Sequence, residues 1–371
     1  MTITLNLLQD LATPHNNALV AALRSQYPDL RVVTWYGMRL HKLLPWKEPL
    51  GGENDNHYCD TWPAKLKLAS RVLFRPSEKF MAVGYSTFGT RFLLLASWLL
   101  RRCFIYWTDL PVGNHQTLLR RWARAVIYRI LKRRARPLFV VGDRANAFFV
   151  KQGFPAANVV NLPIFIELPE PMSDADRSAV RDKYKMPNDN CLAVAASRLD
   201  FSKGYDLLLQ ALRLLDSNVL RRLTVLIVGS GPEGERLRAL VQELALDECV
   251  KFEAWLDPSS YAQVIGAADV FLHPARFDAF GGGTLYAMAS GVAVIGSHGA
   301  GSAAERIIHG QNGFLYSPDD LQELAAHVAY VVTHPEERKA MGRQARQTAE
   351  SWPPKRGAAM IRAALENGTR A

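Results

Sequence analysis

Two basic residues follow the first β-rich run in the C-terminal half of the chain. The run from Leu192 to Ala196 leads into the loop sequence SRLDFSKG, which places Arg198 and Lys203 just before a helical pattern. Open parallel sheets bind ligands beyond the carboxyl ends of their strands. A guanidinium there can bind phosphate oxygens with two hydrogen bonds, and an ammonium can act as a point charge. Alone, both residues would also suit solvated loop cations. With the motifs below, we predict that they bind a diphosphate.

A glycine-rich turn lies further along the chain. The sequence from His273 to Ser297 reads HPARFDAFGGGTLYAMASGVAVIGS, so a strand ends near an acid, Asp278, and three glycines precede a helical pattern. Free N–H groups at a helix N-terminus attract anions, and a carboxylate can accept hydrogen bonds from sugar hydroxyls. A tight turn that needs glycine for positive φ is the alternative. The anion-binding residues predicted here are Gly281, Gly282, Gly283 and Thr284.

A weaker signal of the same kind is the sequence VGSGP, which contains Gly229 and Gly231. It too closes a β-rich run before a helical pattern. Any Rossmann-like strand can end in this way, so the motif has little specificity alone. Its occurrence together with the other motifs gives it weight, and on that basis we assign both glycines to the same ligand site.

Five pieces of the sequence, in order, resemble family 4 of the glycosyltransferases, which are retaining enzymes of the GT-B fold. The resemblance covers about residues 190 to 335. The joint occurrence of the pieces is far more specific than any one of them. They are SRLDFSKGYDLLLQAL, IVGSGPEGERLRAL, VKFEAWLDPSSYAQVIGAADVFLHPARFD, AFGGGTLYAMASGVAVIGS and GSAAERIIHGQNGFLY.

The resemblance implies roles for individual residues. Arg198 and Lys203 match the Arg and Lys that bind the donor diphosphate in this family. The segment Ala254, Trp255 and Leu256 matches the one beside the nucleotide base. Sugar transfer then needs no strong protein base, because the leaving phosphate takes the proton of the acceptor, and it needs no metal or other cofactor.

Two positions depart from the family pattern. The acidic pair of the family, two Glu eight positions apart, maps onto Asp278 and Tyr286. Asp278 keeps the carboxylate on a shorter side chain, whereas Tyr286 stands where a Glu binds the ribose, so ribose binding must differ or the site is degenerate. Glu305 falls where the family has a recurring Glu, and a helix-capping role is the alternative.

The N-terminal half matches the family less well, because the glycine-rich turn after its first strand is missing. A helix start is predicted by Thr13 as N-cap and Pro14 at the first helical position. We expect the free N–H groups of this helix, and the side chains of His15 and Asn16, to face the donor phosphate. An exposed histidine is the alternative for His15. Relatives often carry a His-Asp pair near the sequence YWTDLP. Here the His is absent and Asp109 remains. We place Asp109 near the acceptor hydroxyl, with a turn aspartate as the alternative.

Both halves alternate β-rich runs with helical patterns, which is typical of parallel sheets covered by helices. We predict two Rossmann-like domains facing a cleft, the GT-B architecture, with a hinge near residues 163–172. The N-terminal domain, residues 1–165, would bind the acceptor and face the membrane. The C-terminal domain, residues 166–352, would bind the nucleotide sugar. Residues 353–371 would form a helix that returns to the N-terminal domain. Residues 37–76 read as loop with short helices.

The charge of the chain is unevenly distributed. Of its net +10, residues 1–165 contribute 23 Lys and Arg against 9 Asp and Glu. The sequence RRWARAVIYRILKRRAR, residues 120–136, has eight basic residues, no acid and interleaved apolar residues. We predict an amphipathic helix that binds an anionic membrane, with an ordinary surface helix as the alternative. Nucleic acid is not expected, because no recognised binding module accompanies the basic residues.

Composition sets further limits on the class of protein. Four scattered cysteines without a CxxC pair predict neither a disulfide framework nor a zinc site. We expect no signal peptide from the residues at the start of the sequence, and the longest apolar run is far shorter than a membrane span. We expect a cytoplasmic protein, peripheral on the inner face of the cell membrane.

The function predicted is transfer of a hexose from a nucleoside-diphosphate sugar to a glycan hydroxyl with retention of configuration. The acceptor expected is a lipid-linked glycan of bacterial surface polysaccharide or glycolipid synthesis. A sugar-nucleotide epimerase of GT-B-like fold and a non-catalytic sugar-nucleotide-binding protein remain alternatives. An NAD-dependent oxidoreductase is a weaker alternative, because no predicted strand is followed by GxGxxG with an acid about 20 residues further on.

Overall fold

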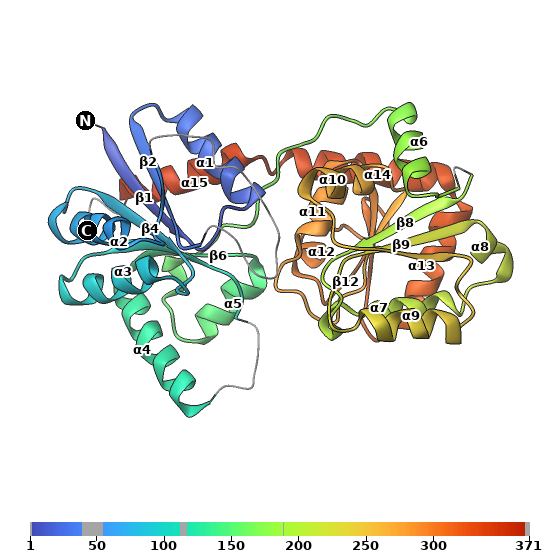
Figure 1. Cartoon of the computed structure of the whole chain (residues 1–371), viewed down its shortest axis with the longest axis horizontal. Coiled ribbons are helices and arrows are strands. Elements are labelled where there is room, and N and C mark those ends of the chain that lie inside the picture. The colour runs from blue at the N-terminus through green and yellow to red at the C-terminus, as the bar shows by residue number, and fades with distance from the viewer. Residues whose placement is uncertain (1, 39–54, 112–116, 188, 368–371) are drawn as a thin grey trace. The chain divides into compact units, whose positions relative to one another are not determined.

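The computed structural model describes residues 2–38, 55–111, 117–187 and 189–367. These residues form two compact units, which Figure 1 shows coloured along the chain. Unit 1 comprises residues Met1–Phe165 and Pro354–Ala371, and unit 2 comprises Ile166–Pro353. The chain therefore passes from one unit to the other twice.

Unit 1 contains a seven-stranded parallel sheet of order β3-β2-β1-β4-β5-β6-β7. The strand order reverses direction between β1 and β4, which are hydrogen-bonded neighbours. The strands are β1 (Ile3–Gln9), β2 (Leu30–Tyr36), β3 (Asn56–Tyr58), β4 (Lys79–Val83), β5 (Phe104–Thr108), β6 (Ala135–Val140) and β7 (Val159–Asn161).

Helices cover this sheet and begin at good capping residues. The hydroxyl of Thr13 accepts a hydrogen bond from the backbone N–H of Asn16, and that of Thr87 does the same for Thr90, so each supplies a partner that a helix start otherwise lacks. The helices are α1 (Pro14–Gln26), α2 (Trp62–Phe74), α3 (Phe88–Leu99), α4 (Leu118–Arg134), α5 (Asp143–Lys151), the short η1 (Ala156–Asn158) and α15 (Pro354–Asn367).

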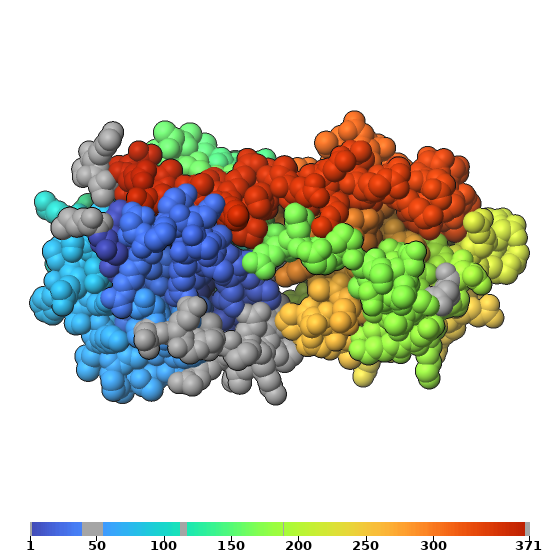
Figure 2. Space-filling model, turned by 90° about the horizontal axis from the view of Figure 1, so that it is seen from above, coloured from blue at the N-terminus to red at the C-terminus, as the bar shows by residue number. Residues whose placement is uncertain are grey.

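The C-terminal helix belongs to unit 1 although 188 residues of unit 2 precede it in the sequence. Helix α15 packs against α1, and Figure 2 shows the red end of the chain lying along the blue N-terminal helix. Gly357 is the point of closest approach: a Cβ there would lie 2.5 Å from Phe165 and 2.9 Å from Leu19. The missing side chain is therefore what allows the helix to sit on the core of unit 1.

Unit 2 contains a six-stranded parallel sheet of order β10-β9-β8-β11-β12-β13. Its order reverses between β8 and β11. All residues of β8, β9, β11 and β12 are buried, as expected for parallel strands covered on both faces. The strands are β8 (Cys191–Ala196), β9 (Leu223–Val228), β10 (Val250–Glu253), β11 (Val270–His273), β12 (Ala293–Ser297) and β13 (Gly313–Tyr316).

Helices pack on both faces of this second sheet and form two apolar clusters with it. The helices are α6 (Asp174–Lys183), the short η2 (Phe201–Lys203), α7 (Tyr205–Leu212), α8 (Ser217–Arg221), α9 (Gly234–Glu243), α10 (Pro258–Gly266), α11 (Gly282–Ala289), α12 (Gly301–Arg306), α13 (Leu321–Thr333) and α14 (Pro335–Glu350).

Three features differ from the sequence-based expectation. Residues 62–74, expected in a region of loop with short helices, form the 13-residue helix α2, whereas residues 39–54 of that region lie outside the described residues. Helix α6, which the sequence did not predict, follows directly after the expected hinge. The basic helix ends at Arg134 instead of residue 136, because Arg136 precedes Pro137, which disfavours a helical residue before it, and both are part of β6.

Candidate functional site

The candidate site of unit 2 lies where the strand order reverses. Strands β8 and β11 are neighbours, but the helices that follow them lead in opposite directions along the sheet. In open α/β sheets, ligands bind at this switch point beyond the carboxyl ends of the strands. The loop after β8, residues 197–204, and the loop after β11, residues 274–281, contact each other there through the bond from Phe277 N–H to the carbonyl of Ser202.

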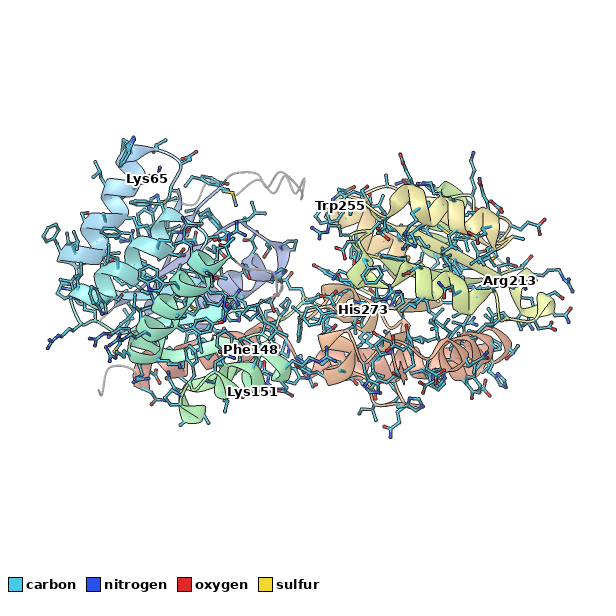
Figure 3. The ribbon with its side chains drawn as sticks, turned by 90° about the horizontal axis from the view of Figure 1, so that it is seen from below. Lys65, Phe148, Lys151, Arg213, Trp255 and His273 are labelled. Atoms are coloured by element: carbon cyan, nitrogen blue, oxygen red, sulfur yellow. The ribbon has the colours of Figure 1, made fainter. Side chains whose placement is uncertain are left out.

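A connected group of polar side chains joins these two loops. The ammonium of Lys203 donates to Oδ2 of Asp278 at 2.5 Å, and Nε2 of His273 lies 3.2 Å from the same oxygen. Nδ1 of His273 lies 2.8 Å from the hydroxyl of the fully buried Thr284. His273, the last residue of β11, is labelled in Figure 3. The structure therefore brings together Lys203, Asp278 and Thr284, which the sequence predicts for the site.

The environment of Asp278 keeps its carboxyl group ionised. Burial by itself would raise the pKa of Asp278, but the hydrogen bond and charge of His273, together with the ion pair to Lys203, outweigh burial and hold that pKa well below its usual range. The site therefore presents a carboxylate beside an ammonium. Such a pair can bind a ligand that carries both hydroxyl groups and phosphates.

The three glycines after Asp278 have different surroundings. Gly281 has φ +89°, and a Cβ there would lie 2.3 Å from the His273 ring; a Cβ on Gly283 would lie 2.5 Å from the Phe271 ring. Both glycines are thus required by the packing of the protein itself. Gly282 has nothing within 4 Å of the position of a Cβ. The first turn of α11 is therefore open at Gly282, where an anion can approach its free N–H groups.

Arg198 lies in the same loop as Lys203 but is much more exposed. Its side chain is 57% exposed, and its Nε donates to Asp200 at 2.8 Å. Asp200 in turn caps η2 by accepting from the N–H of Ser202. One edge of the guanidinium is therefore held by Asp200, while the side chain as a whole stays accessible to a ligand.

The glycines of the VGSGP motif pack against the loop after β8. A Cβ on Gly229 would lie 1.9 Å from the carbonyl oxygen of Ser197, and one on Gly231 would lie 2.2 Å from that of Leu199. The N–H of Leu199 donates to the carbonyl of Ser230 at 3.0 Å. Internal packing thus accounts for both glycines, and it fixes the loop that carries Arg198 and Lys203.

Tyr286, which stands where the family has a Glu, lies in α11 and packs against another tyrosine. Its ring and that of Tyr261 in α10 meet edge to face at 5.7 Å. The hydroxyl of Tyr261 donates to the carbonyl of Ala196 at the end of β8, 3.4 Å away. Two aromatic side chains therefore occupy the region next to the loop after β8, and the ribose role of position 286 stays a prediction.

The remaining residues predicted for the donor site in unit 2 lie in two other places. Ala254, Trp255 and Leu256 connect β10 to α10; Ala254 is exposed, and Leu256 packs on the apolar cluster beneath. Glu305 lies near the end of α12 and not at its start, so it is not an N-terminal cap of that helix. The roles assigned to these residues stay predictions.

In unit 1 the predicted residues lie at the start of α1, beyond the end of β1. Thr13 caps the helix as expected, and its hydroxyl also lies 3.1 Å from Nε2 of His15. Asn16 is buried, and its amide donates to Gln9 at 2.8 Å. The side chain of Asn16 therefore stabilises the turn between β1 and α1, whereas His15 is half-buried.

Asp109 directly follows β5 and bonds to its neighbour in sequence. Its Oδ1 accepts a hydrogen bond from the N–H of Leu110 at 3.1 Å, and the residue is exposed. An Asx turn needs a bond to the N–H two residues further on, so this contact does not decide for the turn aspartate considered as an alternative. The position at the carboxyl edge of the sheet is also the one that the acceptor role requires, so that role stays a prediction.

Sequence reasoning did not assign a role to two features of the site. His273 is the first residue of the motif HPARFD. Its position at the end of a β-rich run could have indicated that it belongs to the site. Arg276 forms two hydrogen bonds, 2.6 and 2.9 Å, to the buried Asp206 of α7, and its guanidinium stacks on Phe201 at 4.1 Å. This pair holds the loop after β11 on α7, which keeps Asp278 within hydrogen-bonding distance of Lys203.

Within the described part of the chain, no group of three or more His, Cys, Asp or Glu side chains has the arrangement of a metal site. A search of the described helices for one with the length and apolar character of a bilayer span finds none.

Two parallel α/β units, the second with a cationic loop and a glycine-rich helix start at its switch point, define the GT-B class of fold. Comparison with solved structures agrees. A structure of Anabaena HepE in complex with UDP superposes with a TM-score of 0.79, covering 98% of this chain and 100% of that one. The identity is 19%, so this likeness concerns the fold.

Comparison of sequences gives matches over part of the chain. Residues 176–348 match the model of the glycosyl transferases group 1. The chain is 30% identical over 256 residues, 66% of its length, to the GDP-mannose-dependent alpha-(1-6)-phosphatidylinositol monomannoside mannosyltransferase of Mycolicibacterium smegmatis. It is 32% identical over 187 residues, 47% of its length, to the D-inositol 3-phosphate glycosyltransferase of Saccharomonospora viridis. The resemblance to GT-B glycosyltransferases that the five sequence pieces indicate is confirmed.

These alignments span only part of the relatives. The matched region covers 63% of the mycobacterial mannosyltransferase and 43% of the inositol phosphate enzyme.

Proposed function

We propose that the protein is a retaining glycosyltransferase that moves a hexose from a nucleoside-diphosphate sugar to a hydroxyl group of a glycan. One observation carries this proposal: the ion pair of Lys203 and Asp278 lies at the switch point of unit 2, beside the open N-terminus of α11. A diphosphate needs cations and free N–H groups, and a sugar needs a hydrogen-bond acceptor. The family match of residues 176–348 supports the same activity.

In the proposed reaction the protein acts mainly through fixed charges. Lys203, Arg198 and the N–H groups of α11 stabilise the negative charge that develops on the departing diphosphate. Asp278 accepts hydrogen bonds from hydroxyls of the transferred sugar. The departing phosphate takes the proton of the acceptor hydroxyl, and the new glycosidic bond forms on the face that the diphosphate leaves. We propose that no metal ion takes part.

The acceptor that we propose is a lipid-linked glycan at a membrane, as in bacterial surface polysaccharide or glycolipid synthesis. The printed name of the mycobacterial relative describes a phosphatidylinositol-based acceptor for that protein. In the present chain, α4 carries seven Lys and Arg and no acid. A helix of this kind can hold unit 1 on the anionic inner face of a cell membrane.

The experiment is incubation of the full chain with a panel of labelled sugar nucleotides that includes GDP-mannose and UDP-glucose. Release of nucleoside diphosphate, with and without lipid-linked acceptors, measures turnover. We expect release with at least one donor, stimulation by an acceptor and full activity in the presence of a chelator. Tyr286 motivates the alternative of a non-catalytic protein, for which donor would bind without release. Interconversion of two sugar nucleotides without an acceptor would instead identify an epimerase.

A further inference from the structure

Three neighbouring helices of unit 1 share a surface that is both apolar and basic. Helices α2 and α3 contact each other, α3 contacts α4, and all three cover the same apolar cluster of the sheet. Figure 1 shows them in order along one side of the unit. Together they contain 11 Lys and Arg and no Asp or Glu. We name the outward side of these helices the α2–α4 face.

The central helix of this face is apolar on its outer side as well as its inner side. Helix α3 has a single charged residue, Arg91, in 12 residues. It buries Leu93 and Leu94 in the core, yet Leu95 and Leu99 are exposed, the latter by 63%. A solvated surface helix carries polar residues on its outer side. Water is therefore an unfavourable neighbour for the outer side of α3.

The flanking helices repeat this pattern near their first turns. On α2, Trp62 is 71% exposed, and the ammonium of Lys65 lies over its ring at 5.2 Å. Figure 3 labels Lys65, which projects from α2 at the outer surface of unit 1. On α4, Leu118 and Trp122 are exposed beside arginines. Tryptophan with neighbouring Lys or Arg is the typical composition of a surface at the boundary between lipid and water.

We propose that the α2–α4 face inserts shallowly into a bilayer, with α3 as its apolar centre and the basic residues of α2 and α4 on lipid headgroups. The occupant follows from charge complementarity. The three helices contain 11 cations and no anion, and apart from Arg71, which pairs with Glu78, these cations fit an anionic surface. The exposed leucines and tryptophans of the face need an apolar phase beneath that surface. Nucleic acid would satisfy the charge but would leave the apolar side chains in water.

The position of the face agrees with the proposed reaction. In a parallel α/β unit each helix begins at the carboxyl edge of the sheet, where ligands bind. Phe88, Trp62 and Leu118 belong to the first turns of their helices, so they lie toward the edge at which Asp109 follows β5. This inference extends the proposed membrane-held acceptor: the apolar face would set the depth at which the acceptor hydroxyl reaches unit 1.

The test is vesicle binding by the full chain, measured by co-sedimentation. The vesicles contain phosphatidylcholine alone or phosphatidylcholine with phosphatidylglycerol, each at low and high salt. We expect a salt-resistant component of binding, because burial of apolar surface is not screened. The double variant Leu95→Ser and Leu99→Ser should weaken that component by about tenfold or more, as expected for withdrawing two leucines from an apolar phase.

A matched control uses exposed apolar residues of unit 2. The double variant Leu214→Ser and Ile308→Ser changes two side chains of similar exposure outside the face and should bind as the wild type does. Trp98 is an exposed residue of α3. Brominated lipids should quench its fluorescence, measured as the difference between wild type and Trp98→Phe. Equal binding of wild type and the α3 variant, binding abolished by salt, or a dimer that the α3 variant dissociates would each overturn the inference.

Failure of this inference and failure of the proposed function are distinguishable. Nucleoside diphosphate release in the absence of lipid measures the donor site alone. Insertion without any donor turnover would leave the α2–α4 face as a membrane surface on a protein of another activity. Turnover without insertion would leave a glycosyltransferase that meets its acceptor in another way.

Discussion

At the scale of single residues, Lys203 and Arg198 are the cations of the site, and they differ in their surroundings. Lys203 is held by Asp278, whereas Arg198 is largely exposed. Substitution of either by Ala should lower turnover by about 10²- to 10³-fold, as removal of a group that stabilises developing charge does. The measurement is nucleoside diphosphate release, with thermal unfolding to show that the fold is intact.

Arg213→Ala provides the matched control for these variants. Arg213 is an exposed arginine at the end of α7, in the same unit as the site. It should leave turnover unchanged. Wild-type turnover of Lys203→Ala or Arg198→Ala would contradict the assignment of these residues to the diphosphate.

Asp278 and its partner His273 should affect transfer more than nucleotide affinity. We assign Asp278 to the sugar, so Asp278→Asn should lower kcat strongly and raise the Kd of the nucleoside diphosphate only slightly. His273→Ala removes the hydrogen bond that orients the carboxylate, and it should also lower kcat more than nucleotide affinity, with a smaller loss than Asp278→Asn. Calorimetric binding of the nucleotide beside transfer kinetics gives both values. An equal loss of affinity and transfer would move Asp278 away from the sugar.

At the scale of elements, the start of α11 offers a comparison between two adjacent glycines. An added methyl group at Gly282 meets nothing in the protein, whereas at Gly281 it meets the His273 ring at a backbone φ of +89°. Gly282→Ala should therefore keep the unfolding temperature and weaken donor binding, because the methyl group narrows the approach to the helix N–H groups. Gly281→Ala should destabilise unit 2.

Both glycine variants are read by thermal unfolding and by nucleotide titration. Nucleotide affinity of Gly282→Ala equal to that of the wild type would show that the ligand does not approach α11 at this turn. Stability of Gly281→Ala equal to that of the wild type would show that the loop relaxes around the added group.

The basic helix α4 gives a prediction that depends on charge alone. Neutralising Arg120, Arg121, Arg133 and Arg134 together should weaken binding to anionic vesicles by up to about 4 kcal/mol, at about 1 kcal/mol for each charge near the surface. Donor hydrolysis should not change. Wild-type binding should fall with salt, since screening limits these charges to about 8 Å at physiological ionic strength. Equal binding of the variant and the wild type to anionic vesicles would show that α4 is a solvated surface.

The elements differ in how far the sequence predicts them. The strands of unit 2 are predicted because buried parallel strands are continuous apolar runs between helical patterns. Helix α2 is not predicted, because Trp62, Leu66 and Phe74 are exposed while Leu68 and Val72 are buried, so apolar residues on both sides obscure its period. The same property that hides α2 in the sequence makes it part of the α2–α4 face.

The candidate site is predictable only in part, for a similar physical reason. Local motifs indicate Lys203, Asp278 and the start of α11, because a helix start and its glycines are neighbours in sequence. The contact of His273 with Asp278 depends on which side of β11 the last residue faces, which a buried, uniformly apolar strand does not reveal. The packing of Gly229 against Ser197 joins loops of two different strands, and no local pattern contains it.

At the scale of the whole molecule, the two units have opposite charge. Unit 1 contains 27 Lys and Arg against 10 Asp and Glu, and unit 2 contains 18 against 25. The anionic donor that we propose would therefore meet a unit of net negative charge, and its binding would depend on local cations such as Lys203 and Arg198. An anionic membrane meets the unit of net positive charge. The charge of each unit thus separates the two kinds of partner that we propose.

The connection between the units gives a last prediction, on stability. Helix α15 packs in unit 1 through Gly357, and an added side chain there meets Phe165, a fully buried residue. Gly357→Leu should destabilise unit 1 by about 1–3 kcal/mol, the usual cost of overpacking. Hydrogen exchange followed by mass spectrometry measures the rate of amide exchange in each unit separately. Exchange should accelerate in α1 and α15 and stay unchanged in β8 and β9, whose packing lies within unit 2.

Ala363→Leu is the control for this substitution. Ala363 is an exposed residue of the same helix, so its variant adds the same side chain without meeting the core, and it should leave exchange in α1 unchanged. If Gly357→Leu accelerates exchange equally in β8 and β9, the two units unfold as one cooperative body. If it accelerates exchange nowhere, α15 is not held on unit 1 by this contact, and the second crossing of the chain has another anchor.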